Sequence, residues 1–375
     1  MFLTLNINEI QAQIPAPNLY CIKGDTVRWD IPTINCGAFQ AYELYAAQNF
    51  SGPYSLLSTI TDPNQTEFIY TNSPGGIIYY YMRSLASCAG QNSLTSDTLD
   101  SASPLPVNIQ VVSVTGNDID IFWTAGLSPE THAYIIYKGL GGGAVQPLDT
   151  VTTLNYSDTN KSTNDSSYTY YITALDRCGG TSVFSTPHAT MLLTGAVDTC
   201  SQLISIDFTP YLGWPGNINY YVLVSENNGP EYIAGTTLLN NFIIDNLTDD
   251  VDYCIRIQAN EPGQNGLSFS NQICLHSKIN ETISNLCITG FIQESGSNVI
   301  EDGNAILDLV TNDNIPLLNV VYQQTDNLSL FNNQNENPLN RISGQNSAVL
   351  DIENLKINYF KAISIDACGN RIASN

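Results

Sequence analysis

Nine cysteines are the residues of this chain best suited to chemistry, and their spacing favours disulfide bonds. None forms a Cys-x-x-Cys pair, and Cys21 and Cys36 are fifteen residues apart (36 − 21 = 15). A zinc site needs paired cysteines or histidines at shorter spacing. Cysteines without such spacing, in a chain rich in β-forming residues, are typical of an oxidising compartment. We therefore expect disulfides rather than a metal centre.

The three histidines, His132, His188 and His276, do not suggest a catalytic triad, because no serine or cysteine nucleophile is spaced to meet them locally. Carboxylates are frequent, but no helix or cleft pattern sets two of them at a working distance. We therefore expect a protein that is not an enzyme and has no catalytic or cofactor-binding residues.

Calcium is the one cofactor that the acidic turns suggest. Asp249-Asp250-Val251-Asp252 and Asn312-Asp313-Asn314 offer oxygen ligands, of which calcium needs six to eight. Neither segment matches an EF-hand loop. The simpler interpretation, a solvated turn, is favoured at both places.

The charge of the chain restricts its partners. Twelve basic and 35 acidic residues give a net charge of −23, which repels phosphate backbones and anionic lipid headgroups. No run of 18 apolar residues is present, so the sequence predicts no membrane insertion. Nucleic acid and membranes are therefore not expected partners, and the charge is typical of a soluble extracellular protein.

An internal repeat organises the chain. The segment YYITALDRCGG at 170–180 returns as YYMRSLASCAG at 80–90 and as FKAISIDACGN at 360–370. The cysteine step is 90 residues from Cys88 to Cys178 and 190, or two steps of 95, from Cys178 to Cys368. A repeat of this length predicts one small β-domain copied along the chain.

Strand patterns recur in the same order within each repeat. Two tryptophans 94 residues apart mark equivalent strands, and alternating apolar residues follow at matching positions. We expect an all-β array of four β-sandwiches, at 14–103, 104–194, 195–279 and 280–375, with the last one incomplete. The expected core markers are Trp29, Trp123, Phe208, Tyr168 and Tyr253.

The run Tyr79-Tyr80-Tyr81 sends alternate rings to opposite faces of a strand. Outward rings either stack on sugars or pack across neighbouring strands, and the structural role is favoured.

Each repeat resembles a fibronectin type III domain, with a tryptophan strand, a tyrosine strand and a Tyr-x-apolar-x-apolar-x-Ala strand. More narrowly, several segments resemble large secreted proteins of the Bacteroidota, which are associated with gliding motility and exported by type IX secretion. These segments are Asn35-Cys36-Gly37-Ala38-Phe39, Ser96-Asp97-Thr98-Leu99-Asp100, Ser128-Pro129-Glu130-Thr131, Tyr134-Ile135-Ile136-Tyr137 and Asp198-Thr199-Cys200.

This resemblance implies a secreted protein at the bacterial cell surface that acts as an adhesin, a structural spacer or an assembly unit. Its partner would be a surface protein or glycan, or a second copy of the chain. The alternatives are carbohydrate-binding or accessory domains of a larger secreted enzyme, and a subunit of a secretion or gliding-motility complex.

The fibronectin-like fold also implies disulfide partners. Its B–C and F–G loops share one pole, which brings Cys36 near Cys88, with Cys21 as the competitor, and Cys287 near Cys368. Cys254 and Cys274 flank the turn at 262–266 and should face each other across a hairpin. Cys178 and Cys200 remain: if they pair, the second and third repeats meet at a bend. Cys21 is then the unpaired candidate, either as a buried thiol or as an intermolecular bridge.

Overall fold

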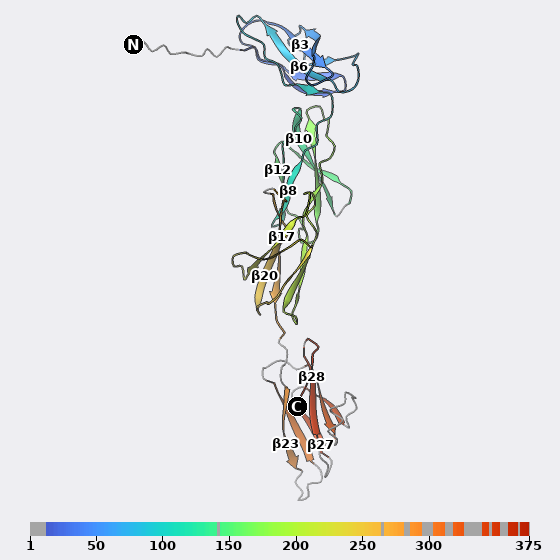
Figure 1. The fold of residues 1–375 in the computed structure, drawn as a ribbon, viewed down its shortest axis with the longest axis vertical. Helices are drawn as coiled ribbons and strands as arrows, with labels where there is room; N and C mark the ends of the chain where they lie inside the picture. The colour runs from blue at the N-terminus through green and yellow to red at the C-terminus, as the bar shows by residue number, and fades with distance from the viewer. Residues whose placement is uncertain are drawn as a thin grey trace, which may run out of the picture.

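The protein is described here by a computed structural model that covers residues 13–140, 143–263, 266–280, 286–294, 303–311, 318–325, 340–344, 347–352, 359–366 and 368–374. These residues form antiparallel strands and contain no helix. The molecule is elongated, and its pairs of sheets follow one another along the long axis (Figure 1). The fold is therefore all-β, as the sequence predicts.

The first two sandwiches each pack a three-stranded sheet against a four-stranded one, with orders β1-β2-β5 against β4-β3-β6-β7 and β12-β9-β8 against β11-β10-β13-β14. Their strands are β1 (Asn18–Lys23), β2 (Thr26–Asp30), β3 (Phe39–Ala47), β4 (Ser55–Ile60), β5 (Glu67–Ile69), β6 (Tyr79–Ala86), β7 (Leu99–Asp100), β8 (Ile109–Thr115), β9 (Asp118–Trp123), β10 (Thr131–Leu140), β11 (Gln146–Val151), β12 (Asn155–Asp158), β13 (Tyr168–Asp176) and β14 (His188–Ala189).

The third and fourth sandwiches repeat this arrangement, with orders β15-β16-β19 against β18-β17-β20-β21, where β22 also pairs with β20, and β23-β24-β27 against β26-β25-β28-β29. Their strands are β15 (Leu193–Asp198), β16 (Leu203–Phe208), β17 (Asn219–Glu226), β18 (Tyr232–Thr237), β19 (Asn241–Ile244), β20 (Val251–Asn260), β21 (Leu267–Phe269), β22 (Ile273–Ser277), β23 (Leu286–Glu294), β24 (Gly303–Thr311), β25 (Leu318–Thr325), β26 (Asn340–Gly344), β27 (Ser347–Ile352), β28 (Tyr359–Ile365) and β29 (Arg371–Ala373).

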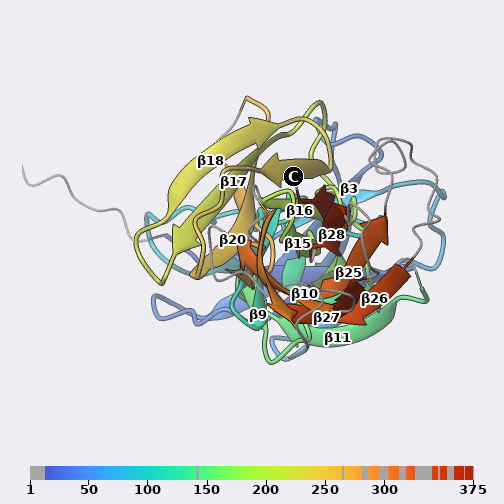
Figure 2. The same cartoon turned by 90° about the horizontal axis from the view of Figure 1, so that it is seen from below.

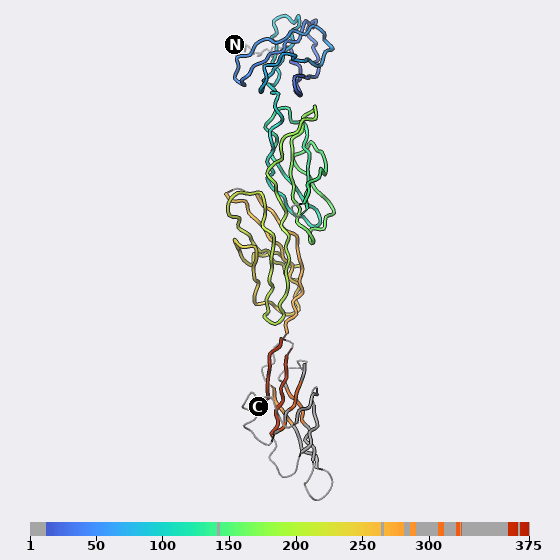
Figure 3. The backbone as a smooth tube through the Cα atoms, turned by 90° about the vertical axis from the view of Figure 1, so that its right-hand side faces the viewer, coloured from blue at the N-terminus to red at the C-terminus, as the bar shows by residue number. Residues whose placement is uncertain are grey.

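In every sandwich the first, second and fifth strands make one sheet and the fourth, third, sixth and seventh make the other. We letter these strands A, B and E, and C′, C, F and G. Two sheets packed face to face with this connectivity define a fibronectin type III-like, immunoglobulin-like sandwich. Viewed along the long axis the sandwiches lie behind one another (Figure 2), and the second and third overlap side by side for part of their length (Figure 3).

Each core lies between its two sheets because strand residues alternate between the sheet faces. In β13, Tyr168, Tyr170, Ile172 and Ala174 face inward. All five predicted core markers are buried: Trp29, Trp123, Phe208, Tyr168 and Tyr253. Burial of one such side chain stabilises a sandwich by roughly 1.5–3 kcal/mol.

The division into folding domains at residues 104, 195 and 280 stays a prediction. The buried clusters bear on one of these boundaries, because Met191 and Leu193 pack in the cluster of the third sandwich although they precede residue 195. The chain therefore enters the third core directly after β14.

Candidate functional site: the junctions between sandwiches

Two disulfides lie inside single sandwiches, at the positions that the sequence predicts. Cys36 is bonded to Cys88, with their Cα atoms 5.2 Å apart, between the B–C and F–G loops of the first sandwich. Cys254 is bonded to Cys274 across the antiparallel pair β20–β22. These bonds fix local geometry and connect no two sandwiches.

The other two disulfides connect neighbouring sandwiches, and here the predicted partners are wrong. Cys178 is bonded to Cys21 of the first sandwich rather than to Cys200. Cys200 is bonded to Cys368 of the fourth sandwich, so Cys368 does not pair with Cys287. The predicted unpaired cysteine is also wrong: Cys21 is bonded and buried, and Cys287 is the exposed free thiol of the described residues.

The two bonds between sandwiches share one geometry. In each, a cysteine near the A–B end of one sandwich meets a cysteine in the F–G turn of the next. The Cys287–Cys368 prediction is wrong because it sought partners at one pole within a sandwich, and the Cys178–Cys200 prediction is wrong because it joined the second repeat directly to the third. The A–B end of one sandwich and the F–G turn of the next instead face each other across a junction. We call them the first junction (Cys21–Cys178) and the third junction (Cys200–Cys368).

The F–G turns that carry Cys178 and Cys368 are built alike. Asp176 accepts hydrogen bonds through Oδ1 from the backbone N of Cys178 at 2.7 Å and of Gly180 at 2.8 Å. Asp366 accepts through Oδ1 from the backbone N of Cys368 at 3.0 Å and of Asn370 at 2.8 Å.

A glycine follows the cysteine in each turn, with φ of 81° at Gly179 and 82° at Gly369, a region where a side chain is strained. The Asp-x-Cys-Gly sequence therefore presents the cysteine outward from the strand end.

The other two repeats lack this turn. Ala86 and Ala89 stand in the first repeat where Asp176 and Gly179 stand in the second, and its Cys88 bonds within its own sandwich. In the third repeat the position of the cysteine is held by Gly263. The second junction, between the second and third sandwiches, therefore has no such disulfide.

Polar contacts surround the disulfide of the first junction. The Arg177 guanidinium lies 4.0 Å from the centre of the Tyr20 ring, and its Nη1 lies 2.6 Å from Oδ2 of Asp30. Hydrogen bonds from Arg177 hold the pKa of Asp30 below its ordinary value. Lys23 donates from Nζ to the carbonyl of Cys178 at 3.2 Å. The arrangement sets a cation–π contact and an ion pair beside one covalent bond.

At the third junction, the A–B turn of the third sandwich is held in place by Asp198 and Asn280. Asp198 accepts through Oδ1 from the backbone N of Cys200 and of Ser201, each at 3.0 Å, and the bonds from Ser201 lower its pKa most. Asn280 donates from its backbone N to Thr199 O at 3.0 Å and from Nδ2 to Thr199 Oγ1 at 2.9 Å. Cys200 therefore meets the fourth sandwich from a fixed turn.

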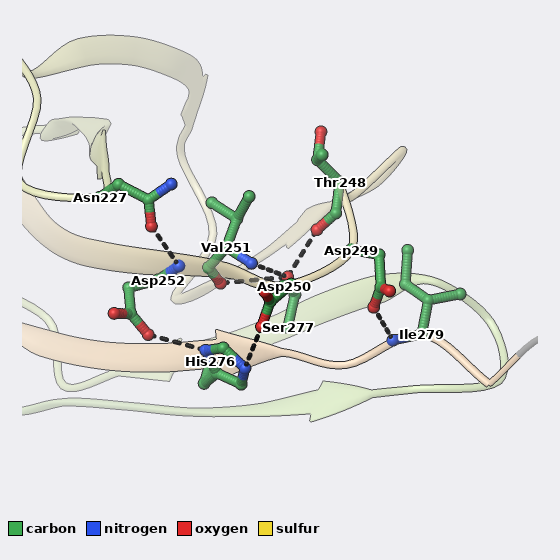
Figure 4. A network of polar contacts seen from close by, with 9 residues as sticks. All are labelled: Asn227, Thr248, Asp249, Asp250, Val251, Asp252, His276, Ser277 and Ile279. Atoms are coloured by element: carbon green, nitrogen blue, oxygen red, sulfur yellow. Dashed lines mark hydrogen bonds and ion pairs between the residues drawn. The ribbon is translucent and has the colours of Figure 1, made fainter.

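Next to this turn lies the acidic segment considered for calcium (Figure 4). Asp249 accepts through Oδ1 from the backbone N of Ile279 at 2.7 Å. Asp252 Oδ1 lies 2.9 Å from His276 Nδ1, and Asp250 Oδ1 lies 3.3 Å from His276 Nε2. Asp249 thus accepts from a backbone N–H, whereas Asp250 and Asp252 both contact the His276 ring. Among the described residues no group of three or more His, Cys, Asp or Glu is gathered as a metal site. The segment 312–314 lies outside the described residues.

The second junction is built from backbone and buried polar groups along the edge strand β8. Val112 N donates to the hydroxyl of Tyr211 at 3.0 Å, and Val112 O accepts from Ser268 Oγ at 2.7 Å. Phe269 N donates to Ser113 Oγ at 3.0 Å, and Trp214 Nε1 donates to the Gln110 carbonyl at 2.7 Å. An edge strand presents unpaired N–H and C=O groups. Here the third sandwich supplies their partners.

The B–C loop of the third sandwich contributes to the contact with β8. Tyr211 is buried, its hydroxyl oxygen accepts the Val112 N–H, and the same hydroxyl lies 2.8 Å from Nδ1 of His188, within hydrogen-bond distance. Burial lowers the pKa of His188 to about 4 and raises that of Tyr211. Gly213 has a φ of 124°, and a Cβ on it would lie 2.3 Å from the His188 ring. The second junction therefore needs a neutral imidazole and a glycine facing it.

Sequence reasoning did not select Arg177, Tyr211 or Trp214. A signal existed for Trp214, because the third repeat has Phe208 in the strand that holds Trp29 and Trp123 in the first two, and carries its own tryptophan six residues later. His132, on β10, and His276, on β22, do not join His188 at the junction.

The outward tyrosines of the first sandwich pack against one another. Tyr45 and Tyr81, directly opposite on β3 and β6, stack with ring centres 4.8 Å apart, and Arg83 lies 5.1 Å from the Tyr45 ring centre. Tyr54 meets Tyr81 edge-on at 5.0 Å. These rings cover one another across the strands, which is the structural role that the sequence favours.

No protein-family model and no curated protein matches the chain. Among solved structures it is similar to titin kinase and its flanking domains, with 14% identity and a TM-score of 0.21 over 28% of this chain and 27% of that chain. The described residues contain no helix of a length and apolarity suited to crossing a membrane. The disulfides fit an extracellular protein.

Proposed function

We propose that this protein is a non-catalytic, load-bearing spacer at a bacterial cell surface, where it holds a protein or glycan partner, or a second copy of itself, away from the cell. The sequence resemblance adds the proposal that the cell is one of the Bacteroidota and that export uses type IX secretion. The observation that carries the function is the pair of disulfides between sandwiches.

These disulfides change the path that a pulling force takes through the chain. A tension applied outside residues 21–368 passes from Cys21 to Cys178 through sulfur, and from Cys200 to Cys368 in the same way. The bypassed loops have sequence separations of 157 and 168 residues. Between the junction bonds only the segment from Cys178 to Cys200, a separation of 22 residues (200 − 178), bears the load.

A chain loaded in this way lengthens little even if every sandwich unfolds. The 22-residue segment reaches at most about 80 Å when fully extended, at roughly 3.6 Å per residue. A string of sandwiches without such bonds would release the length of each one as it unfolds. Resistance to lengthening is a property that a spacer under tension at a cell surface needs.

Single-molecule force spectroscopy tests this proposal. The chain is held by tags at its two ends, and contour-length gains are measured with and without reductant. The oxidised protein should show no gain beyond about 80 Å between the junction bonds. Reduction should release the large loops.

Cysteine-to-serine variants separate the contributions of the first and third junctions. In C21S/C178S the loop of 157 residues is released, except for the 52 residues that Cys36–Cys88 still closes. The remaining 157 − 52 = 105 residues should extend by about 380 Å, before the distance they span in the folded protein is subtracted. In C200S/C368S, 168 − 20 = 148 residues should extend by about 530 Å. The control C254S/C274S removes a bond inside one loop and should leave the oxidised trace unchanged. Stepwise gains of several hundred ångströms from the oxidised wild type would refute the load-bearing role.

A further inference from the structure

A polar cavity, partly open to solvent, lies at the second junction. Its volume is about 370 Å³, within the range of small-molecule sites, roughly 300–1,000 Å³. The second sandwich contributes its A–B turn, with Asn117, and the segment of Asn164 before β13. The third sandwich contributes Glu231, Arg256 on β20, and Gln272. The walls thus come from two sandwiches that meet along β8.

The charges in this cavity cancel. Arg256 donates from Nη2 to Glu231 Oε2 at 2.5 Å, and both side chains are about one third exposed, at 32% and 33%. Among the described residues that line the cavity, no other side chain is ionisable. An anionic or cationic ligand would therefore find no unpaired counter-charge, and in a chain of net charge −23 an anion is also repelled as it approaches.

The remaining polar groups both donate and accept hydrogen bonds. Within the described part of the chain, the side-chain amides of Asn117 and Gln272 have no hydrogen-bond partner. Asn164 accepts through Oδ1 from Asn271 Nδ2 at 3.0 Å, while its own Nδ2 donates to no described residue. Arg256 adds a buried Nε–H without an acceptor among the described residues. Primary amides beside a neutralised Arg–Glu pair match hydroxyl groups, which also donate and accept.

We propose that this cavity binds a neutral sugar, one or two pyranose units of an oligosaccharide, across the second junction. The amides of Asn117, Asn164 and Gln272 bind its hydroxyls, and the Arg256–Glu231 pair borders it. This inference does not rest on the load-bearing function, because a sugar would connect the two sandwiches whether or not the chain carries force. Since both sandwiches supply groups, binding also stabilises the junction.

Side-chain amide signals in the nitrogen–proton NMR spectrum of the oxidised full chain test the proposal. The probes are cellobiose, maltose, lactose and mannobiose at 10 mM, with glucuronate and glucose 6-phosphate as charged comparisons. At least one neutral disaccharide should shift the Asn117, Asn164 and Gln272 signals in a saturable way. The charged sugars should bind at least tenfold more weakly.

The double variant N117A/Q272A, at two exposed positions, should weaken this binding at least tenfold without changing thermal unfolding in the absence of sugar. The control N155A/Q146A, at exposed positions on β12 and β11, should bind as the wild type does. Absence of shifts with all four neutral sugars, binding that survives N117A/Q272A, or shifts produced only by a neutral acetylated and amidated Ser-Gly-Asn peptide would each overturn the proposal. Because no force is applied, this result is independent of the load-bearing test.

Discussion

The first and second junctions each hold two neighbouring sandwiches together, but through different interactions. The first joins two sandwiches by one covalent bond, Cys21–Cys178, with exposed polar contacts around it. The second has no disulfide and depends on buried hydrogen bonds along β8 and on the contact of Tyr211 with His188. The first junction, which we also call the covalent junction, should therefore tolerate acid and polar substitutions but not reduction. The second, or packed, junction should tolerate reduction but not acid or a larger side chain.

The largest expected effect is at Gly213 in the packed junction. In G213A the new Cβ meets the His188 ring and the backbone is strained at a φ of 124°, so we expect a loss of about 3 kcal/mol or more in unfolding free energy. Urea denaturation followed by Trp fluorescence measures it. The control is G216A in the same loop, where φ is 87° but the nearest atoms lie at 3.8 Å. If G213A lost no more than G216A, close packing against His188 would not define this junction.

The second largest expected effect is the loss of stability that acid causes at the packed junction. The pKa of His188 falls from its ordinary 6.5 to about 4 in the fold, so folding favours the neutral ring. This contribution to stability is complete above pH 6.5 and is lost as the pH falls toward 4. The expected loss in unfolding free energy is about 2 kcal/mol by pH 5 and about 3 kcal/mol by pH 4.

Urea denaturation between pH 7 and 4 measures this loss. H188Q should be less stable at pH 7 but should show a flatter dependence on pH, while H276Q, at an exposed site, should follow the wild type. Identical pH profiles for H188Q and the wild type would contradict the assignment.

A smaller effect is expected in the turn that presents Cys178. D176A removes the acceptor of two backbone N–H groups at a buried position, which should cost about 1–3 kcal/mol. The turn would then hold Cys178 less firmly. Oxidative refolding, quenched with a thiol-alkylating reagent, should show slower formation of the Cys21–Cys178 bond, with Cys36–Cys88 formed at the wild-type rate.

The smallest effect is expected at Arg177. R177A removes the ion pair to Asp30 and the contact with Tyr20, but these groups are well exposed, so the loss should stay within about 1 kcal/mol and shrink at high salt. Denaturation at low and at 1 M salt measures it. A loss of several kcal/mol would mean that the polar contacts, rather than the disulfide, hold the first junction.

Residue pattern alone predicted the sandwich fold, because alternation along a strand determines which face is buried. Trp29, Trp123 and Tyr253 are in their predicted cores for this reason. Two disulfides were also predicted, since Cys36–Cys88 and Cys254–Cys274 join places that one sandwich brings together.

The junctions were not predictable in the same way. The partner of Cys178 depends on how two sandwiches are oriented, and a repeat in the sequence gives no orientation. Tyr211 and Gly213 belong to a loop that packs against His188 of the preceding sandwich. Non-local contacts of this kind leave little trace in local pattern.

Mass mapping of the peptides of the unreduced protein, after its free thiols are alkylated, tests the central claim most directly. The account predicts one linked pair containing Cys21 and Cys178, a second containing Cys200 and Cys368, and an alkylated Cys287. A peptide linking Cys178 to Cys200, or Cys287 to Cys368, would contradict it.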